Sequence, residues 1–275
     1  MKYMLDELFL SLRNNISLFK KNISGIYLTQ KPIGSKIDYL KIFKLAKKNN
    51  NSQIAKIEKD LGFRINKNWL NKLALKTQIV IKKSDINYQH GRLLYCLIRK
   101  KLSNFNEGKN FNVLEVGTAR GFSSIVISKA INDSKKKGSI ATIDIIPHHK
   151  KIYWNTIDDV NGPQTRKSLL KHYRKYQKII TFFTGKSLKI IKKISHKQYH
   201  FIFLDGNHDF YNVKQEYELV KNLQKKNDIL LLDDVTVKKF DGIVKLLELI
   251  RKENKYKIRK ITSDPKRGYA ILTKK

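Results

Sequence analysis

The chain has 275 residues, of which 41% are hydrophobic, which is enough to bury the core of one large domain. Its formal net charge is +35, yet only ten of its 58 basic residues are Arg. Proteins that bind bases and phosphates favour Arg for its planar, bidentate fork, so we attribute the charge to an AT-rich coding sequence and expect no nucleic-acid partner. The single cysteine, Cys96, excludes an internal disulfide and a zinc site built from cysteines.

The N-terminal third is predicted to be helical. Apolar residues recur at helical spacing in 37–46 and 69–75, and we see no alternating β pattern. Residues 1–16 lack the uninterrupted apolar stretch of a signal peptide, and no run approaches membrane-spanning length. We therefore expect a cytoplasmic protein with no membrane partner. Its residues 1–105 would form a helical extension that covers the site or mediates dimerisation into a homo-oligomer.

From Phe111 onward, short apolar runs alternate with helical patterns. The runs that predict strands are Phe111–Val116, Ile140–Ile143, Ile179–Thr184, His200–Leu204, Ile229–Leu232, Tyr256–Ile261 and Tyr269–Thr273. The helices are expected near 122–132, 164–176, 187–194, 213–226 and 241–253. Such alternation predicts a parallel sheet with right-handed crossovers, and the short turn between the last two runs makes that pair antiparallel. We expect residues 106–275 to form an α/β domain with a Rossmann-like, seven-stranded sheet that ends in an antiparallel hairpin.

A glycine-containing segment follows the first predicted strand and opens a helix. It reads Glu115-x-Gly117-x-x-x-Gly121, which differs from the Gly-x-Gly-x-x-Gly of dinucleotide binders. Its glycines allow a tight turn and a close ligand, and its carboxylate suits a cation such as the methionine portion of S-adenosylmethionine. Asp144, after the second strand, is placed to accept hydrogen bonds from ribose hydroxyls. Two glycines alone would indicate an ordinary tight turn, but together with Asp144 and the strand pattern they favour a cofactor site.

Acidic residues follow the fourth and fifth predicted strands. Asp205 has His208 three residues on, and the next strand ends at Asp233 and Asp234. Three carboxylates at adjacent strand ends repel one another unless they share a cation or a proton, and Mg²⁺ prefers oxygen ligands. A hydroxyl polarised by such a cation is more acidic, and His208 can take its proton. The alternative is that these aspartates cap helices or turns and that His208 is an ordinary loop histidine.

Two segments carry a resemblance to a known family. Val113–Gly121 resembles motif I of class I S-adenosylmethionine-dependent methyltransferases, and Ile140–Asp144 resembles their second motif. The resemblance implies that motif I borders the methionine portion of the cofactor and that Asp144 binds its ribose. The residues that would contact the cofactor are Glu115, Gly117, Thr118, Gly121, Asp144, Gly185, Ser187 and Asp205.

The acidic segments resemble those of metal-dependent, small-molecule O-methyltransferases of the catechol and macrolide-sugar types. The Asp-x-x-His spacing is closer to the sugar-modifying branch. This resemblance implies that Asp205, Asp233 and Asp234 bind the metal and that His208 is the catalytic base. The catechol type has Asp-Asn where this chain has Asp233-Asp234, which weakens a catechol assignment.

The expected function is Mg²⁺-dependent O-methylation of a hydroxyl on a small molecule, such as a sugar or a glycosylated metabolite. An RNA methyltransferase that uses the basic N-terminal region is the alternative. The low Arg share and the missing Asn/Asp-Pro-Pro-aromatic motif argue against it. A third hypothesis is a non-enzymatic, cofactor-binding partner subunit. The long connection 146–168 is interpreted as a lid on the substrate side.

Overall fold

Five parallel strands and a terminal hairpin form the central sheet of the protein. We describe a computed structural model for residues 19–22, 26–84, 86–195, 197–236, 240–264 and 267–275. The predictions for residues 1–16 therefore lie outside the described residues. The seven strands are β3 (Phe111–Val116), β4 (Gly138–Asp144), β5 (Ile180–Thr184), β6 (Phe201–Leu204), β7 (Ile229–Leu232), β8 (Tyr256–Asp264) and β9 (Arg267–Lys274).

The strand order is β5-β4-β3-β6-β7-β9-β8, and only β9 and its neighbours pair in antiparallel fashion. The chain leaves β3 toward one edge of the sheet through β4 and β5, and then crosses back to add β6 on the other side of β3. The carboxyl ends of β3, β4 and β6 thus border the point where the strand order reverses, which is where open α/β sheets bind ligands. The predicted α/β fold with a seven-stranded sheet and a terminal hairpin is confirmed.

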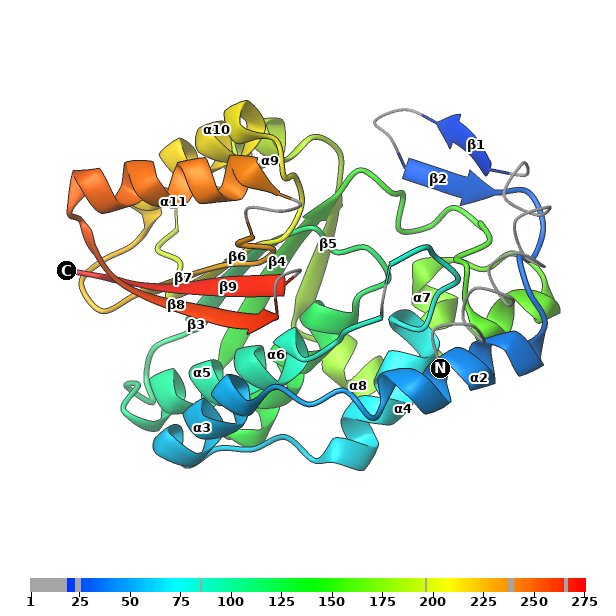
Figure 1. The fold of residues 1–275 in the computed structure, drawn as a ribbon. Helices are drawn as coiled ribbons and strands as arrows, with labels where there is room; N and C mark the ends of the chain where they lie inside the picture. Colours follow the sequence, from blue (N-terminus) through cyan, green and yellow to red (C-terminus); the bar gives the residue numbers. More distant parts are fainter. Residues whose placement is uncertain (1–18, 23–25, 85, 196, 237–239, 265–266) are drawn as a thin grey trace.

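Helices cover both faces of the sheet (Figure 1). On one face lie α9 (Ser187–Ile194), α10 (Phe210–Val220) and α11 (Asp241–Glu253), whose apolar residues form one core cluster with the strands. On the other face lie α3 (Ser52–Leu61), α4 (Lys67–Thr77), α5 (His90–Ser103), α6 (Phe122–Asp133) and the short α8 (Arg174–Gln177). Burial of both faces explains why the parallel strands read as continuous apolar runs rather than as alternating ones.

The described part of the N-terminal region packs into the same core as the sheet. Helix α2 (Lys36–Ala46) begins at a capping box in which Ser35 and Asp38 bond reciprocally to each other's backbone amides. One hydrophobic cluster runs from Ile33 in this region to Ile271 in β9. No helix among the described residues is long and apolar enough to cross a membrane.

Two local predictions were wrong. A small antiparallel hairpin, β1 (Phe19–Asn22) and β2 (Ile26–Thr29), precedes α2, where we expected no strands. The helix predicted over 164–176 is broken into α7 (Arg166–Leu169), a 3₁₀ turn at Lys171–Tyr173 and α8. This break lets Leu170 pack next to Gly121 while Tyr173 and Tyr176 both lie edge-on to Trp69, so tertiary packing overrides the helical pattern.

Candidate functional site

The loops that follow β3, β4, β6 and β7 bring the predicted site residues to one edge of the sheet. Glu115, the first residue of the glycine segment, is fully buried. Its carboxylate accepts hydrogen bonds from Ser124 on α6 and from Thr142 on β4, the latter at 2.6 Å. Burial raises the pKa of this carboxyl group, and the surrounding hydroxyls partly oppose that shift. One oxygen, Oε1, has no partner among the described residues, so Glu115 retains an acceptor at the floor of the predicted cofactor site.

Gly117 lies where the β3 loop passes the β6 loop. Its φ is 101°, in the left-handed region that favours glycine, and a Cβ there would overlap the carbonyl oxygen of Asp205. The Gly117 amide donates to the carbonyl of Ile143 at 2.9 Å, which ties the loop to β4. Glycine is therefore required for the close approach of these two loops. The motif residue Thr118 shares a 2.5 Å hydrogen bond with Thr142, and Gly121 opens α6 with φ 87°.

Asp144 lies at the end of β4, as predicted for the ribose-binding residue. Its Oδ2 accepts a hydrogen bond from the amide of Ala119 at 2.5 Å, and its Oδ1 accepts one from the amide of Ile146 at 2.7 Å. The carboxylate is thus oriented by motif I and by its own loop. Each carboxylate oxygen has two lone pairs, so both keep an acceptor position for a hydroxyl donor.

Gly185 and Ser187 follow β5, beside the end of β4. The Gly185 amide donates to the carbonyl of Asp144 at 2.8 Å. The Ser187 hydroxyl donates to the carboxylate of Glu216 at 2.5 Å, which links α9 to α10. Of the two predicted cofactor residues in this segment, Gly185 lies directly against Asp144, whereas the hydroxyl of Ser187 is already hydrogen-bonded to Glu216.

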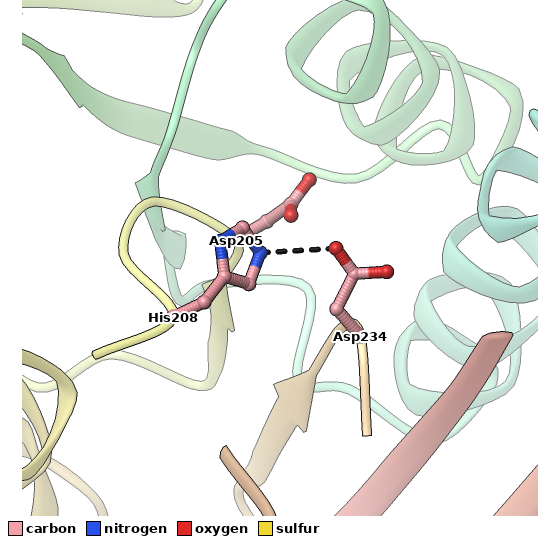
Figure 2. Close-up of side chains that lie close together, drawn as sticks. All are labelled: Asp205, His208 and Asp234. Atoms are coloured by element: carbon pink, nitrogen blue, oxygen red, sulfur yellow. Dashed lines mark ion pairs between the residues drawn. The ribbon is translucent and has the colours of Figure 1, made fainter. Parts of the chain in front are cut away.

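Asp205, His208 and Asp234 form a compact group at the ends of β6 and β7 (Figure 2). Each contributes one potential ligand atom, and these atoms lie within 4.8 Å of one another. His208 Nε2 is 3.0 Å from Asp234 Oδ2, and the imidazole ring stacks on Phe240 at a centroid distance of 4.1 Å. Among the described residues, these three side chains are the ones whose potential ligand atoms lie close enough together to hold a metal ion.

Asp233 is nearby but does not belong to that group. It is buried, and its Oδ1 accepts the amide of Asp234 at 2.6 Å, while Asp234 takes a left-handed φ of 54°. Burial, followed by repulsion between the neighbouring carboxylates, raises the pKa of both Asp205 and Asp233. The structure thus brings together two of the three predicted metal ligands, and it places His208 beside them.

Arg267, at the start of β9, was missed by sequence reasoning. Its Nη1 lies 3.5 Å from Asp234 Oδ1, and the three aspartates 205, 233 and 234 raise the pKa of its guanidinium against the effect of burial. Arg267 thus offsets part of the negative charge of the acidic residues at this edge of the sheet. No motif marks this arginine, because its partner is reached across the sheet, 33 residues away.

The connection 146–168 packs against the N-terminal region. Asn155 accepts hydrogen bonds from the amide of Ile81 at 3.0 Å and from the hydroxyl of Tyr39 at 3.1 Å, and Lys76 pairs with Asp158 at 2.5 Å. A cavity of about 580 Å³ lies along this connection, and none of the described site residues above lines it. The cavity is therefore separate from the strand-end site.

Comparisons with known proteins agree with this geometry. Residues 114–235 match a family model described as a methyltransferase domain. No curated protein matches the sequence. Among solved structures, the O-methyltransferase TomG of Streptomyces achromogenes, in complex with SAM, aligns with a TM-score of 0.54 and 16% identity over 82% of this chain and 97% of that chain.

Two further structures share the fold. The O-methyltransferase of Bacillus cereus, in complex with SAH, aligns with a TM-score of 0.52 and 16% identity over 82% of this chain and 92% of that one. The SAH-bound methyltransferase PaMTH1 of Podospora anserina aligns with a TM-score of 0.51 and 14% identity over 86% and 94%. The matched segment contains motif I, the strand ends and the acidic group. Residues 114–235 thus match a methyltransferase domain in sequence, and the chain shares the fold of these solved methyltransferases.

Proposed function

We propose that this protein transfers the methyl group of S-adenosylmethionine to a hydroxyl of a small molecule, with a divalent cation, Mg²⁺, as its cofactor. The observation that carries the proposal is the convergence of Asp205, His208 and Asp234 directly beside the loop of Gly117. The O-methyltransferases of similar fold, solved with SAM or SAH, support the donor. Neither the compared folds nor any observation on the described residues favours the RNA alternative.

The acidic group fits a hard divalent cation. Asp205 and Asp234 offer the carboxylate oxygens that such a cation prefers, and a bound cation would relieve the repulsion between the neighbouring carboxylates. When bound, the cation would supply Lewis acidity toward the acceptor hydroxyl. The loops of this chain hold donor and acceptor close together, because Gly117 lets the motif I loop contact the backbone of Asp205.

We assign His208 as the general base. Its ring is held by stacking on Phe240 and by the nearby carboxylate of Asp234, and about one third of the side chain is exposed. Asp234 and Phe240 would thus orient the imidazole toward the acceptor hydroxyl whose proton it takes. A sugar or glycosylated metabolite is the first acceptor class to test.

The test is transfer of labelled methyl groups from S-adenosylmethionine to a panel of sugar, glycoside and phenolic acceptors. EDTA should abolish turnover and Mg²⁺ should restore it, while SAH binding measured by calorimetry persists. Full activity of the metal-stripped protein would refute the cation assignment. His208→Ala should bind SAH and Mn²⁺ as the wild type does and lose turnover. Loss of Mn²⁺ affinity would instead identify His208 as a ligand, and normal turnover would exclude it as the base.

We further propose that residues 1–105 serve as a cover for the domain formed by 106–275. The contacts of Tyr39, Lys76 and Ile81 with the connection 146–168 support this role, because they fix the segment that follows the ribose-side strand. Replacing Asn155 by Ala removes the two hydrogen bonds that its side chain accepts, from Tyr39 and from the amide of Ile81. It also removes the hydrogen bond that the side-chain amide donates to the carbonyl of Ile81. We expect that variant to expose 146–168 to limited proteolysis; an unchanged cleavage pattern would contradict the cover.

A further inference from the structure

Arg166 is the first residue of α7 and is almost fully buried, with 1% of its surface exposed. Its Nε donates a hydrogen bond to the carbonyl of Ala119 at 2.8 Å, and its Nη2 donates one to the carbonyl of Ile146 at 3.1 Å. A single guanidinium group therefore joins the motif I loop to the loop that follows β4.

The same two residues are held from their amide side by Asp144. The amides of Ala119 and Ile146 donate to the two oxygens of that carboxylate at 2.5 and 2.7 Å. Each residue is thus held at its N–H by an anion and at its carbonyl by a cation. Because Ala119 belongs to motif I and Ile146 follows the predicted ribose-binding residue, these four bonds set the spacing of the two loops that frame the cofactor.

The motif I loop needs such support. Ala119 has a φ of 44°, a left-handed conformation that residues with a Cβ adopt at an energetic cost and keep only where surrounding contacts enforce it. Arg166 is itself held in place by aromatic rings, since its guanidinium lies 5.3 Å from the centroid of Trp154 and 6.0 Å from that of Phe182. These two rings therefore fix the position of the guanidinium.

We infer that Arg166 is a positioning residue for the S-adenosylmethionine site, which fixes the motif I loop and the Asp144 loop relative to each other through the carbonyls of Ala119 and Ile146. This inference rests on the proposed cofactor. It assigns α7 and the connection that leads to it a role in methyl-donor affinity, in addition to any role as a lid over the acceptor. Two carbonyls on separate loops require a planar, forked donor, which Arg offers and Lys does not.

The experiment compares SAH affinity by calorimetry in the wild type, Arg166→Lys, Arg166→Met and the control Lys76→Met. The control breaks the ion pair of Lys76 with Asp158 in the same connection but leaves Ala119 and Ile146 untouched. We expect the Kd for SAH to rise at least tenfold in Arg166→Met, to rise by a smaller factor in Arg166→Lys, and to stay within twofold in the control. A further variant, Arg166→Ala, tests rescue: added methylguanidinium should restore part of its SAH affinity, whereas methylammonium at equal ionic strength should not.

A merely structural arginine gives a different result. Arg166→Met would then melt at a lower temperature and still bind SAH within twofold of the wild type, which would overturn the inference. If Arg166→Met does not fold, Arg166→Lys decides by the same twofold criterion. If the wild type itself binds no SAH, the proposed function fails at its cofactor. Unchanged SAH binding in the Arg166 variants alone would refute only the role of Arg166.

Discussion

The site has two ends, which satisfy their polar groups in different ways. We call the surroundings of Glu115 and Asp144 the cofactor end, and those of Asp205 and Asp234 the cation end. At the cofactor end, the buried carboxylate of Glu115 is bonded to two hydroxyls, and Asp144 is bonded to two backbone amides. At the cation end, Asp205 and Asp234 lie next to the buried Asp233, and burial and mutual repulsion raise the pKa of Asp205 and Asp233. The first end is preorganised by neutral donors, whereas the second brings together carboxyl groups whose mutual repulsion a bound cation would relieve.

The largest effect is expected from removing one charge at the cation end. Asp234→Asn keeps the shape of the side chain but removes a ligand and the partner of His208. Turnover should fall at least 10³-fold, which corresponds to about 4 kcal/mol of transition-state stabilisation. SAH affinity should stay within a few fold. A parallel loss of SAH affinity would show that the two ends are not separable.

Gly117 lies where the motif I loop of the cofactor end contacts the Asp205 loop of the cation end. Gly117→Ala adds a Cβ against the carbonyl of Asp205 in a left-handed backbone, and we expect it to destabilise the protein by about 3 kcal/mol and to weaken SAH binding. Gly62→Ala is the matched control, since Gly62 has a similar φ of 76° with no atom within 4 Å of the added Cβ. That control should cost only about 1 kcal/mol. Equal losses in urea unfolding would mean that loop contact contributes nothing beyond backbone strain.

His90 gives a smaller, pH-dependent effect near the cation end. It is buried beside Phe122 and Phe203, and burial, followed by the charge of Arg267, lowers its pKa from 6.5 to about 3. Because the unfolded chain binds the proton more readily, His90 stabilises nothing above pH 6.5 and destabilises the fold as the pH falls below it, by about 2 kcal/mol at pH 5.

His90→Phe should therefore gain about 2 kcal/mol relative to the wild type between pH 7 and pH 5 in urea unfolding. The exposed His172 provides the control, and His172→Phe should show no such gain. A His90→Phe variant whose stability follows the wild type across this range would show that the buried imidazole is not the acid-sensitive group.

The sheet could be predicted from sequence because its strands are buried on both faces. The predicted run Ile229–Leu232 is β7 itself, and Phe111–Val116 is β3 itself. Burial on both faces makes such strands continuous apolar runs, which stand out against the charged helices between them. Helix α10 begins at Phe210, three residues before the predicted 213, and the side chain of Asp209, which precedes it, accepts a hydrogen bond from the amide of Asn212.

Side-chain direction at the strand ends could not be predicted. The sequence presents Asp233 and Asp234 as equivalent neighbours, but the left-handed backbone at Asp234 sends only that carboxylate toward His208. The contacts of Arg166 and Arg267 join segments that are 47 and 33 residues apart, so no local spacing marks them. The short hairpin β1–β2 was missed as well, because adjacent lysines, Lys20 and Lys21, break any apolar alternation in its first strand.

The most direct test of the central claim is a calorimetric titration of the SAH-bound protein with Mg²⁺, repeated with the double variant Asp205→Asn/Asp234→Asn. The wild type should bind one cation per chain and the double variant none, while both retain SAH. A wild type that binds no cation, or a double variant that binds it equally well, would contradict the account.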